Sequence, residues 1–321
     1  MRFVVYGAGA IGGVVGGRLA QHGHDVTLIA RGPHYEAIRA HGLTLESQEG
    51  SVTLDVPVVD EPAALKFSDD DVVLLAMKSQ DTAQALRALA AAASSDVPVV
   101  SMQNGVENER AILRRFDRGY GVCVMCPTAH LDPGVVQAFS SPTTGILDVG
   151  RVPDRADGLA EEIAAAFRAS TFASEARADI SKWKYGKLLL NLTNAIDAVC
   201  GPAARSGPLS SLVRREGVAV LRAAGIEFAS KEEDAARRGD LLQVGPVGEG
   251  PRGGASSWQS LARGTGSIEA DYLNGEIVML GRVHGVPTPA NALLQQVANR
   301  LAAEGAPPGS VNADDLLAQL G

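Results

Sequence analysis

The sequence predicts an α/β protein in which a doubly wound parallel sheet forms the N-terminal part and an all-helical C-terminal domain follows. Three observations lead to this prediction. Short Val- and Leu-rich runs alternate with helical patterns early in the chain, as expected for parallel strands buried on both faces. A glycine-rich turn joins the first strand to the first helix. From about Ile180 onward the patterns are mostly helical, and 321 residues suffice for two domains.

The early strands and helices can be placed in order. We expect strands at FVVYG, VTLIAR, DDVVLLAMK and VPVVSMQN, and helices at IGGVVGGRLAQHG, HYEAIRAHG, DTAQALRALAAAAS and VENERAILRRF. The second helix should end at Gly42, because glycine is the usual residue after a helix. The segment LTLESQEGSVTLDV alternates like a β-hairpin that turns near Glu49 and Gly50.

The later elements follow a different pattern. Residues 119–150 are rich in strand formers and Pro/Gly turns, and a helix at 156–169 and a short strand at 171–176 are expected next. We therefore place the domain boundary after residue 177, with domains 1–177 and 178–321. The Gly/Pro-rich stretch 245–257 is expected to be a loop, which we hypothesise closes over a substrate. In VPTPAN, Thr288 and Pro289 have the residue types of a helix start.

Composition excludes several classes of protein. No run of 18 apolar residues occurs, so no membrane span is expected. The net charge of −8 disfavours nucleic acid as a partner. The chain starts directly in a strand pattern and has three cysteines, which indicates no signal peptide and a cytoplasmic, reducing setting.

Cys123 and Cys126 form a CxxC motif inside an apolar run. The pair could be a redox site or half of a zinc site, but no second CxxC or histidine cluster completes a metal site. We favour buried thiols, because free cysteine is among the most buried residue types. No metal is expected.

Gly7, Gly9 and Gly12 form a GxGxxG motif between a strand and a helix. Gly7 allows the tight turn, Gly9 lets the backbone approach a pyrophosphate, and Gly12 lets the helix pack closely on the strand. The helix N-terminus supplies N–H groups for the phosphates. We therefore expect a Rossmann-type dinucleotide site whose loop comprises Gly7, Ala8, Gly9, Ala10, Ile11 and Gly12.

Arg31 ends the second strand, where an NAD-binding site usually places an acidic residue. A guanidinium there can bind the 2′-phosphate of NADP with bidentate hydrogen bonds, so we expect NADPH. Lys78 and Asn104 also follow predicted strands, at the sheet edge where ligands bind. Taken singly, Arg31 could be a surface residue, Lys78 a solvated strand end and Asn104 a turn former.

Lys187, Asn191 and Asn194 recur at helical spacing in KLLLNLTN. They predict a polar stripe on one leucine-rich helix. One proton donor beside neutral amides suits a catalytic site, although a plain solvated face is the alternative.

Taken together, these motifs resemble the ketopantoate reductase family, the NADPH-dependent 2-dehydropantoate 2-reductases. The resemblance covers essentially the whole chain and is carried by GAGAIG at 7–12, Arg31, Lys78 in AMKSQDT, QNG at 103–105, Lys187 and Asn191 in KLLLN, SSWQSLARG and IEADYLNGEIV from 256, and GVPTPAN.

The resemblance implies an NADPH domain followed by a helical domain, with substrate in the cleft. It implies that Lys187 is the general acid and that Glu269 contacts the nascent hydroxyl, the lysine and the cofactor site. Asn191 and a serine, Ser256 or Ser257, would hold the substrate, and Lys78 and Asn104 would line the cofactor and cleft.

Two departures from the family pattern concern the substrate residues. The family's second Asn falls at position 195, which is Ala here, so Asn194 stands in its place one position earlier. We read the SSWQSLARGTGSIEAD segment as one residue longer than usual, so Ser256 and Ser257 compete for one role.

We therefore expect a reductase that converts ketopantoate to pantoate for pantothenate and coenzyme A synthesis. The alternatives are a related NADP-dependent reductase of another small branched 2-keto acid and a non-catalytic NADP(H)-binding sensor. A small 2-keto acid is the expected partner, and a homodimer is left open.

Overall fold

The structure is a computed structural model that describes residues 1–248, 254–264 and 266–321. The chain divides into two compact units. The first comprises residues 1–103, 108–181 and 231–248, and the second comprises residues 104–107, 182–230 and the described residues from 254 onward. The boundary expected after residue 177 stays a prediction, and the return of 231–248 to the first unit was not foreseen.

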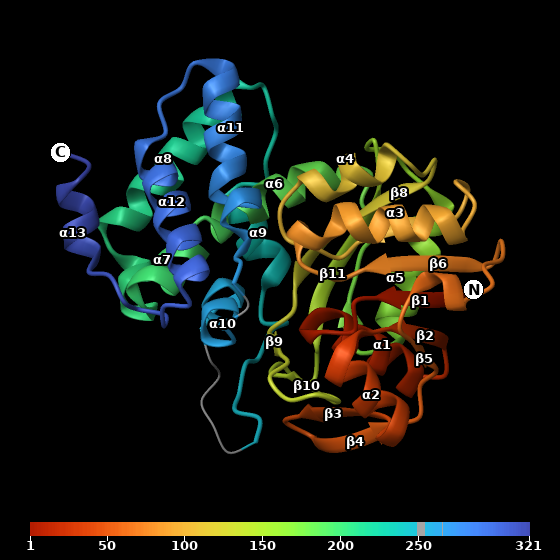
Figure 1. The fold of residues 1–321 in the computed structure, drawn as a ribbon. Coiled ribbons are helices and arrows are strands. Elements are labelled where there is room, and N and C mark those ends of the chain that lie inside the picture. Colours follow the sequence, from red (N-terminus) through yellow and green to blue (C-terminus); the bar gives the residue numbers. More distant parts are fainter. Residues whose placement is uncertain (249–253, 265) are drawn as a thin grey trace. The chain divides into compact units, whose positions relative to one another are not determined.

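A mixed, mostly parallel sheet forms the centre of the first unit (Figure 1). Within the described residues it has eight strands in the order β12-β11-β8-β7-β6-β1-β2-β5. Only the pair β8 and β11 runs antiparallel among them. The strands are β1 (Arg2–Tyr6), β2 (Asp25–Ile29), β5 (Val58–Val59), β6 (Asp71–Leu75), β7 (Val99–Ser101), β8 (Gly119–Met125), β11 (Gly145–Val152) and β12 (Phe172–Ala173).

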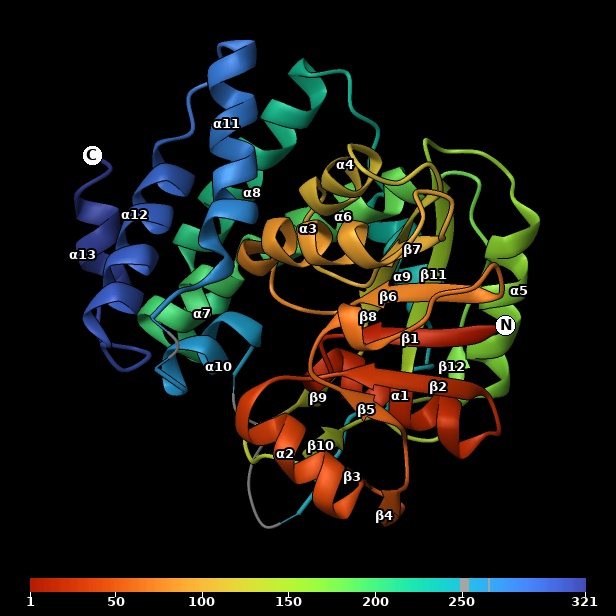
Figure 2. The ribbon, with the colours of Figure 1, turned by 45° about the vertical axis from the view of Figure 1, so that its right-hand side comes forward.

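Both faces of this sheet are covered, which explains the continuous apolar runs in the sequence. Phe3 and Val5 belong to a core that includes residues of α1 and α5, whereas Val4 and Tyr6 belong to another that includes residues of α3 and α4 (Figure 2). The predicted α/β class is therefore confirmed. The helices of this unit are α1 (Ala10–Gln21), α2 (Gly32–His41), α3 (Thr82–Ala92), α4 (Glu107–Leu113), α5 (Gly158–Ala169) and α9 (Lys231–Arg238).

A second, smaller sheet packs on α1. Its described strands lie in the order β4 (Gly50–Leu54), β3 (Leu43–Ser47), β10 (Val135–Ala138) and β9 (Thr128–Ala129). The predicted hairpin at 43–56 supplies β3 and β4, and β10 pairs parallel with β3 from far along the chain. The local hydrophobic pattern of the sequence gives no indication that β10 pairs with β3.

Helix α1 is buried continuously from Gly12 to Leu19, because it lies between the two sheets. A methyl group on Gly16 would come within 2.7 Å of Leu28 on the main sheet. One on Gly13 would come within 2.6 Å of Val136 on the small sheet. The glycines of GGVVGG thus let both sheets approach the helix backbone.

Helix α9 is joined to the first unit through a buried acid. Asp148 on β11 is fully buried and accepts hydrogen bonds from Arg237 at 2.6 and 2.8 Å. Arg177 donates to the same carboxylate at 3.3 and 3.4 Å, and the Glu175 N–H donates at 3.0 Å. The pKa of Arg237 is raised mainly by its hydrogen bond to Asp148.

The second unit is helical, as predicted. A single hydrophobic core contains Val106 together with apolar residues from the helices of this unit. The helices are α6 (Ile180–Asn191), α7 (Asn194–Cys200), α8 (Pro208–Ala223), α10 (Ser256–Ala262), α11 (Asn274–His284), α12 (Pro289–Glu304) and α13 (Ala313–Ala318), with short 3-10 helices η3 (Pro202–Ser206) and η4 (Glu269–Tyr272).

Several local predictions can be compared with these bounds. Gly42 has φ +80° after α2, and Thr288 and Pro289 stand at the start of α12, as expected. The loop expected at 245–257 instead ends in α10 from Ser256, and its residues 249–253 lie outside the described part of the chain. The three cysteines are free thiols, and only Cys123 is fully buried. No described helix combines the length and apolar character needed to cross a membrane.

We predict that Arg237→Ala lowers the free energy of unfolding by at least about 2 kcal/mol, because it leaves the buried Asp148 carboxylate without its shortest hydrogen bonds. The control is Arg238→Ala on the same helix, whose i,i+4 pair with Asp234 is partly exposed and should contribute about 0.5 kcal/mol. Urea denaturation measures both. Equal losses would contradict a special role for the Asp148 cluster.

Candidate functional site

Two glycines of the turn between β1 and α1, Gly7 and Gly12, lie where a side chain would clash. Gly7 has φ +100°, and its N–H donates to the Ile29 carbonyl at 3.0 Å. A methyl group there would lie 2.8 Å from the Met77 nitrogen. One on Gly12 would lie 2.9 Å from the Ala76 methyl group and would overlap the Gly7 carbonyl. Gly7 and Gly12 are thus required by the close packing of the helix on the sheet.

Gly9 has a different reason to be glycine. Its φ of −70° suits any residue, and a methyl group there would meet no atom within 4 Å. Gly9 is the N-cap of α1, and no side chain caps this helix. The first N–H groups of a helix have no partner within it. The open space at Gly9, next to the unpaired N–H groups at the start of α1, fits a pyrophosphate. The other residues of the loop are Ala8, Ala10 and Ile11.

Three expected cofactor residues follow neighbouring parallel strands. Gly7 follows β1, Arg31 follows β2, and Lys78 follows β6, and these strands are adjacent in the order β6-β1-β2. The fold therefore brings their backbones to one edge. Asn104 follows β7 in sequence but belongs to the second unit. There the next residue, Gly105 (φ +79°), packs so closely on η4 that a methyl group would lie 2.9 Å from the Tyr272 carbonyl.

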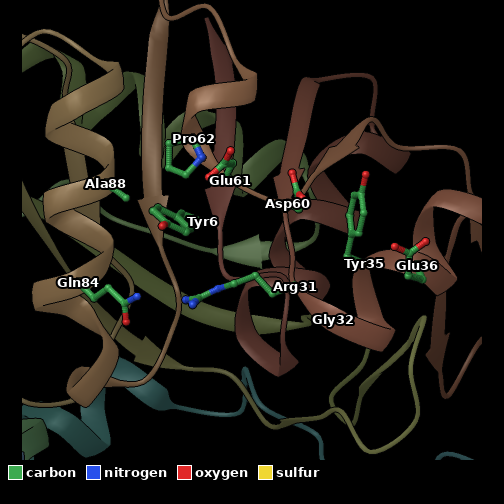
Figure 3. A pocket seen from close by; sticks show the side chains of 10 residues that line it. All are labelled: Tyr6, Arg31, Gly32, Tyr35, Glu36, Asp60, Glu61, Pro62, Gln84 and Ala88. Atoms are coloured by element: carbon green, nitrogen blue, oxygen red, sulfur yellow. The ribbon is translucent and has the colours of Figure 1, made fainter.

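Arg31 lines a pocket of about 430 Å³ at the end of β2. Figure 3 shows its side chain extending toward Gln84 of α3, with the Tyr6 ring close by. Arg31 is exposed and forms no ion pair with any described residue. The pocket is lined by Tyr6, Arg31, Gly32, Tyr35, Glu36, Asp60, Glu61, Pro62, Gln84 and Ala88.

The sequence analysis missed the acidic side of this pocket. Glu36, Asp60 and Glu61 also line it, so three carboxylates share the pocket with one guanidinium (Figure 3). Burial raises the pKa of Tyr6, while the charge of Arg31 lowers it and that of Glu61 raises it. An anionic group bound here would depend on Arg31 for its attraction, because the neighbouring carboxylates repel it.

The predicted polar stripe does not lie on one helix. Lys187 and Asn191 are on α6, but α6 ends at Asn191 and Asn194 begins α7. The Thr193 hydroxyl donates to the Leu190 carbonyl at 3.1 Å. Such a side-chain bond competes with the helical ladder, which explains the break.

Asn191 and Asn194 are nevertheless alike in one respect. They are only 4% and 7% exposed, and neither side-chain amide has a hydrogen-bond partner among the described residues. Their amide atoms are not among those sealed from solvent, so a small polar molecule can reach them. This pattern indicates groups that are kept for a ligand or for water.

The two candidate serines differ in their surroundings. Both begin α10, which is tethered to α7 because the Ala255 N–H donates to the Asp197 carboxylate at 2.6 Å. The Ser256 hydroxyl oxygen is sealed from solvent without a partner. Ser257 is 2% exposed, and its hydroxyl neither forms a hydrogen bond to a described residue nor belongs to the sealed atoms. Ser257 is therefore the better candidate for a ligand contact.

Glu269 begins η4 and is 3% exposed, whereas Lys187 is half-buried. The residues beside these polar groups share one hydrophobic core: Leu188 next to Lys187, and Ile268 and Ala270 on either side of Glu269. This core holds the polar candidates of the second unit on packed elements. The sequence analysis missed Asp197, a fully buried acid whose Oδ1 has no described partner.

Comparisons with known proteins cover both units. A family model described as "Ketopantoate reductase PanE/ApbA" matches residues 3–153, and one described as "Ketopantoate reductase PanE/ApbA C terminal" matches residues 179–302. The chain is 31% identical over 302 residues to the 2-dehydropantoate 2-reductase of Pyrococcus horikoshii, which covers 92% of this chain and 95% of the relative.

Solved structures show the same fold. A PanE/ApbA family ketopantoate reductase from Ralstonia eutropha JMP134 is 31% identical with a TM-score of 0.79, covering 95% of this chain and 99% of that chain. A D-mandelate dehydrogenase solved with NADH and anilino(oxo)acetate has a TM-score of 0.80 with the same coverage. At 23% identity, that second likeness concerns the fold alone.

We predict that Gly9→Ala and Gly12→Ala separate ligand binding from packing. Gly12→Ala should lower the melting temperature, because the new methyl group overlaps the Gly7 carbonyl and overpacking typically costs about 1–3 kcal/mol. Gly9→Ala should melt like the wild type but bind a dinucleotide at least about 10-fold more weakly, because the methyl group occupies the phosphate space. Calorimetry measures both quantities. Undiminished binding by Gly9→Ala would contradict the phosphate site.

Proposed function

This chain belongs to the ketopantoate reductase family, and we propose that it reduces 2-dehydropantoate (ketopantoate) to pantoate with NADPH. The observation that carries the proposal is that both family models match, one on each part of the chain. The unpartnered amides of Asn191 and Asn194 support a polar substrate site in the second unit. The product would feed pantothenate and coenzyme A synthesis, and the free cysteines support a reducing, cytoplasmic setting.

We assign the cofactor to the first unit. The turn around Gly9 would hold the pyrophosphate, Arg31 would bind the 2′-phosphate, and Lys78 would lie near the same sheet edge. When bound, NADPH supplies the hydride. The open space at Gly9 and the absence of an ion pair at Arg31 fit this group.

We assign proton transfer and substrate binding to the second unit. Reduction places negative charge on the carbonyl oxygen of the substrate, and the Lys187 ammonium stabilises it and donates a proton. Solvent then reprotonates the resulting amine. Glu269 contacts the new hydroxyl and orients Lys187. Asn191, Asn194 and the Ser257 hydroxyl hold the substrate as neutral hydrogen-bonding groups, and Asn104 lines the site on the turn that packs on η4.

Oxidation of NADPH across a panel of 2-keto acids tests the reaction. The panel should contain ketopantoate, smaller branched 2-keto acids and the aryl acid benzoylformate, because a D-mandelate dehydrogenase has the same fold. Ketopantoate should have the highest kcat/KM. Turnover of another acid alone would replace the substrate, and NADPH binding without any turnover would favour a sensor.

We predict that Lys187→Ala lowers kcat by about 10²- to 10⁴-fold, because the reaction loses its proton donor. The dissociation constant for NADPH should stay within about threefold, since this is less than 1 kcal/mol. Lys66→Ala, a lysine on the first unit, controls for loss of positive charge. Wild-type kcat in Lys187→Ala would rule out its role as general acid.

We predict that Arg31→Asp weakens NADPH binding by about 10- to 100-fold, because a charge-assisted hydrogen bond to the 2′-phosphate is lost. NADH binding should change by no more than about threefold, since NADH lacks that phosphate. Arg115→Asp makes the same charge change at an exposed site of the first unit outside this pocket. If both cofactors lost affinity equally, Arg31 would be a structural residue.

A further inference from the structure

His34 on α2 contacts the nucleotide loop directly. Its Nε2 lies 2.7 Å from the Ala8 carbonyl oxygen, and its Nδ1 accepts a hydrogen bond from the Gly134 N–H at 2.9 Å. Because a backbone N–H can only donate, Nδ1 carries no hydrogen, and the hydrogen of the neutral ring is on Nε2. The bond from Gly134 therefore fixes the tautomer of His34, and in this tautomer Nε2 donates to the Ala8 carbonyl.

The neutral form of His34 is favoured by its surroundings. Its pKa is lowered to about 4, mainly by burial and also by the neighbouring His130, while the bond to Ala8 opposes this change. The two rings lie 4.1 Å apart at 48°. At neutral pH the ring thus keeps one donor and one acceptor, as its two bonds require.

The Gly134 end of this bridge is anchored. Its carbonyl accepts from the Thr44 N–H of β3 at 2.9 Å, and Gly134 has φ +80°. A methyl group on Gly134 would lie 3.0 Å from that of Ala37 on α2. His34 therefore connects the loop to the small sheet through a close backbone approach.

The bond to Ala8 determines how the next amide points. A trans peptide is planar, and its C=O and N–H point in opposite directions. When His34 holds the Ala8 carbonyl toward α2, the Gly9 N–H must point away from α2. The space at the Cβ position of Gly9 is open.

We propose that His34 is a positioning residue for cofactor binding, which fixes the Ala8–Gly9 peptide so that the Gly9 N–H is oriented for the pyrophosphate before the cofactor arrives. The proposal rests on the proposed NADPH site but not on the identity of the 2-keto acid. Preorganisation of this kind increases affinity, because less conformational freedom is lost on binding.

Two variants separate the two bonds of the ring. In His34→Gln the side-chain amide nitrogen can take the place of Nε2 and keep the donor to Ala8. In His34→Asn the amide oxygen can take the place of Nδ1 and keep the acceptor for Gly134, but nothing reaches Ala8. His41→Asn makes the same residue change at an exposed position of α2 and serves as the control.

The test measures NADPH binding to the full chain by fluorescence titration, together with kcat, KM for NADPH and the melting temperature. His34→Asn should raise the dissociation constant and the KM for NADPH about 10-fold, with kcat at saturation within about threefold. His34→Gln and His41→Asn should bind within about threefold of the wild type.

Equal affinity losses in His34→Asn and His34→Gln would overturn the proposal, as would wild-type binding by His34→Asn. A lower melting temperature in both variants with unchanged affinity would make His34 structural only. Because the readout is NADPH binding, an inactive enzyme that binds NADPH leaves this proposal standing while the reductase proposal fails. A wild-type protein that does not bind NADPH would overturn both.

Discussion

The close packing of α1 between two sheets is the constraint on which the first unit depends. A helix can approach a sheet this closely only where its side chains are absent, and α1 meets both sheets through glycines. Gly12 and Gly16 face the main sheet, and Gly13 and Gly17 face the small one. A larger residue at Gly12, Gly13 or Gly16 would clash with its neighbours, and the helix would have to move outward.

This packing places the nucleotide loop, and the surrounding elements supply its chemistry. Arg31 follows β2 at the sheet edge that also carries the loop. Asp60 and Glu61 follow β5, the neighbour of β2, and place negative charge in the same pocket. The pocket thus repels anions except where the guanidinium lies. If the proposed cofactor binds here, its selection would depend on the balance of a few charges in partly exposed surroundings, where a single substitution can change it.

In the second unit, the side chains proposed to hold the substrate (Asn191, Asn194 and Ser257) are largely buried but have no hydrogen-bond partner among the described residues. Its core fixes α6, α10 and η4 by apolar contacts, so Asn191 and Ser257 need no internal hydrogen bonds to hold their positions. Their polar atoms are not among those sealed from solvent, so water can satisfy them in the free protein. In the proposed function a substrate would take the place of this water.

The sequence by itself determined the α/β class, the helical second half and the GxGxxG turn, because each depends on local periodicity or on one residue type at one spacing. The role of Arg31 in cofactor choice rests on the same kind of signal and stays a prediction. Its motifs also indicated the family to which the chain belongs. Only the tertiary structure decided the rest: the return of α9 to Asp148, the break at Thr193, the acids around Arg31, and the bridge from His34 to Ala8. Apart from the break at Thr193, which a local side-chain bond to Leu190 accompanies, these features bring together residues from separate elements, and such contacts leave no trace in the pattern of either element.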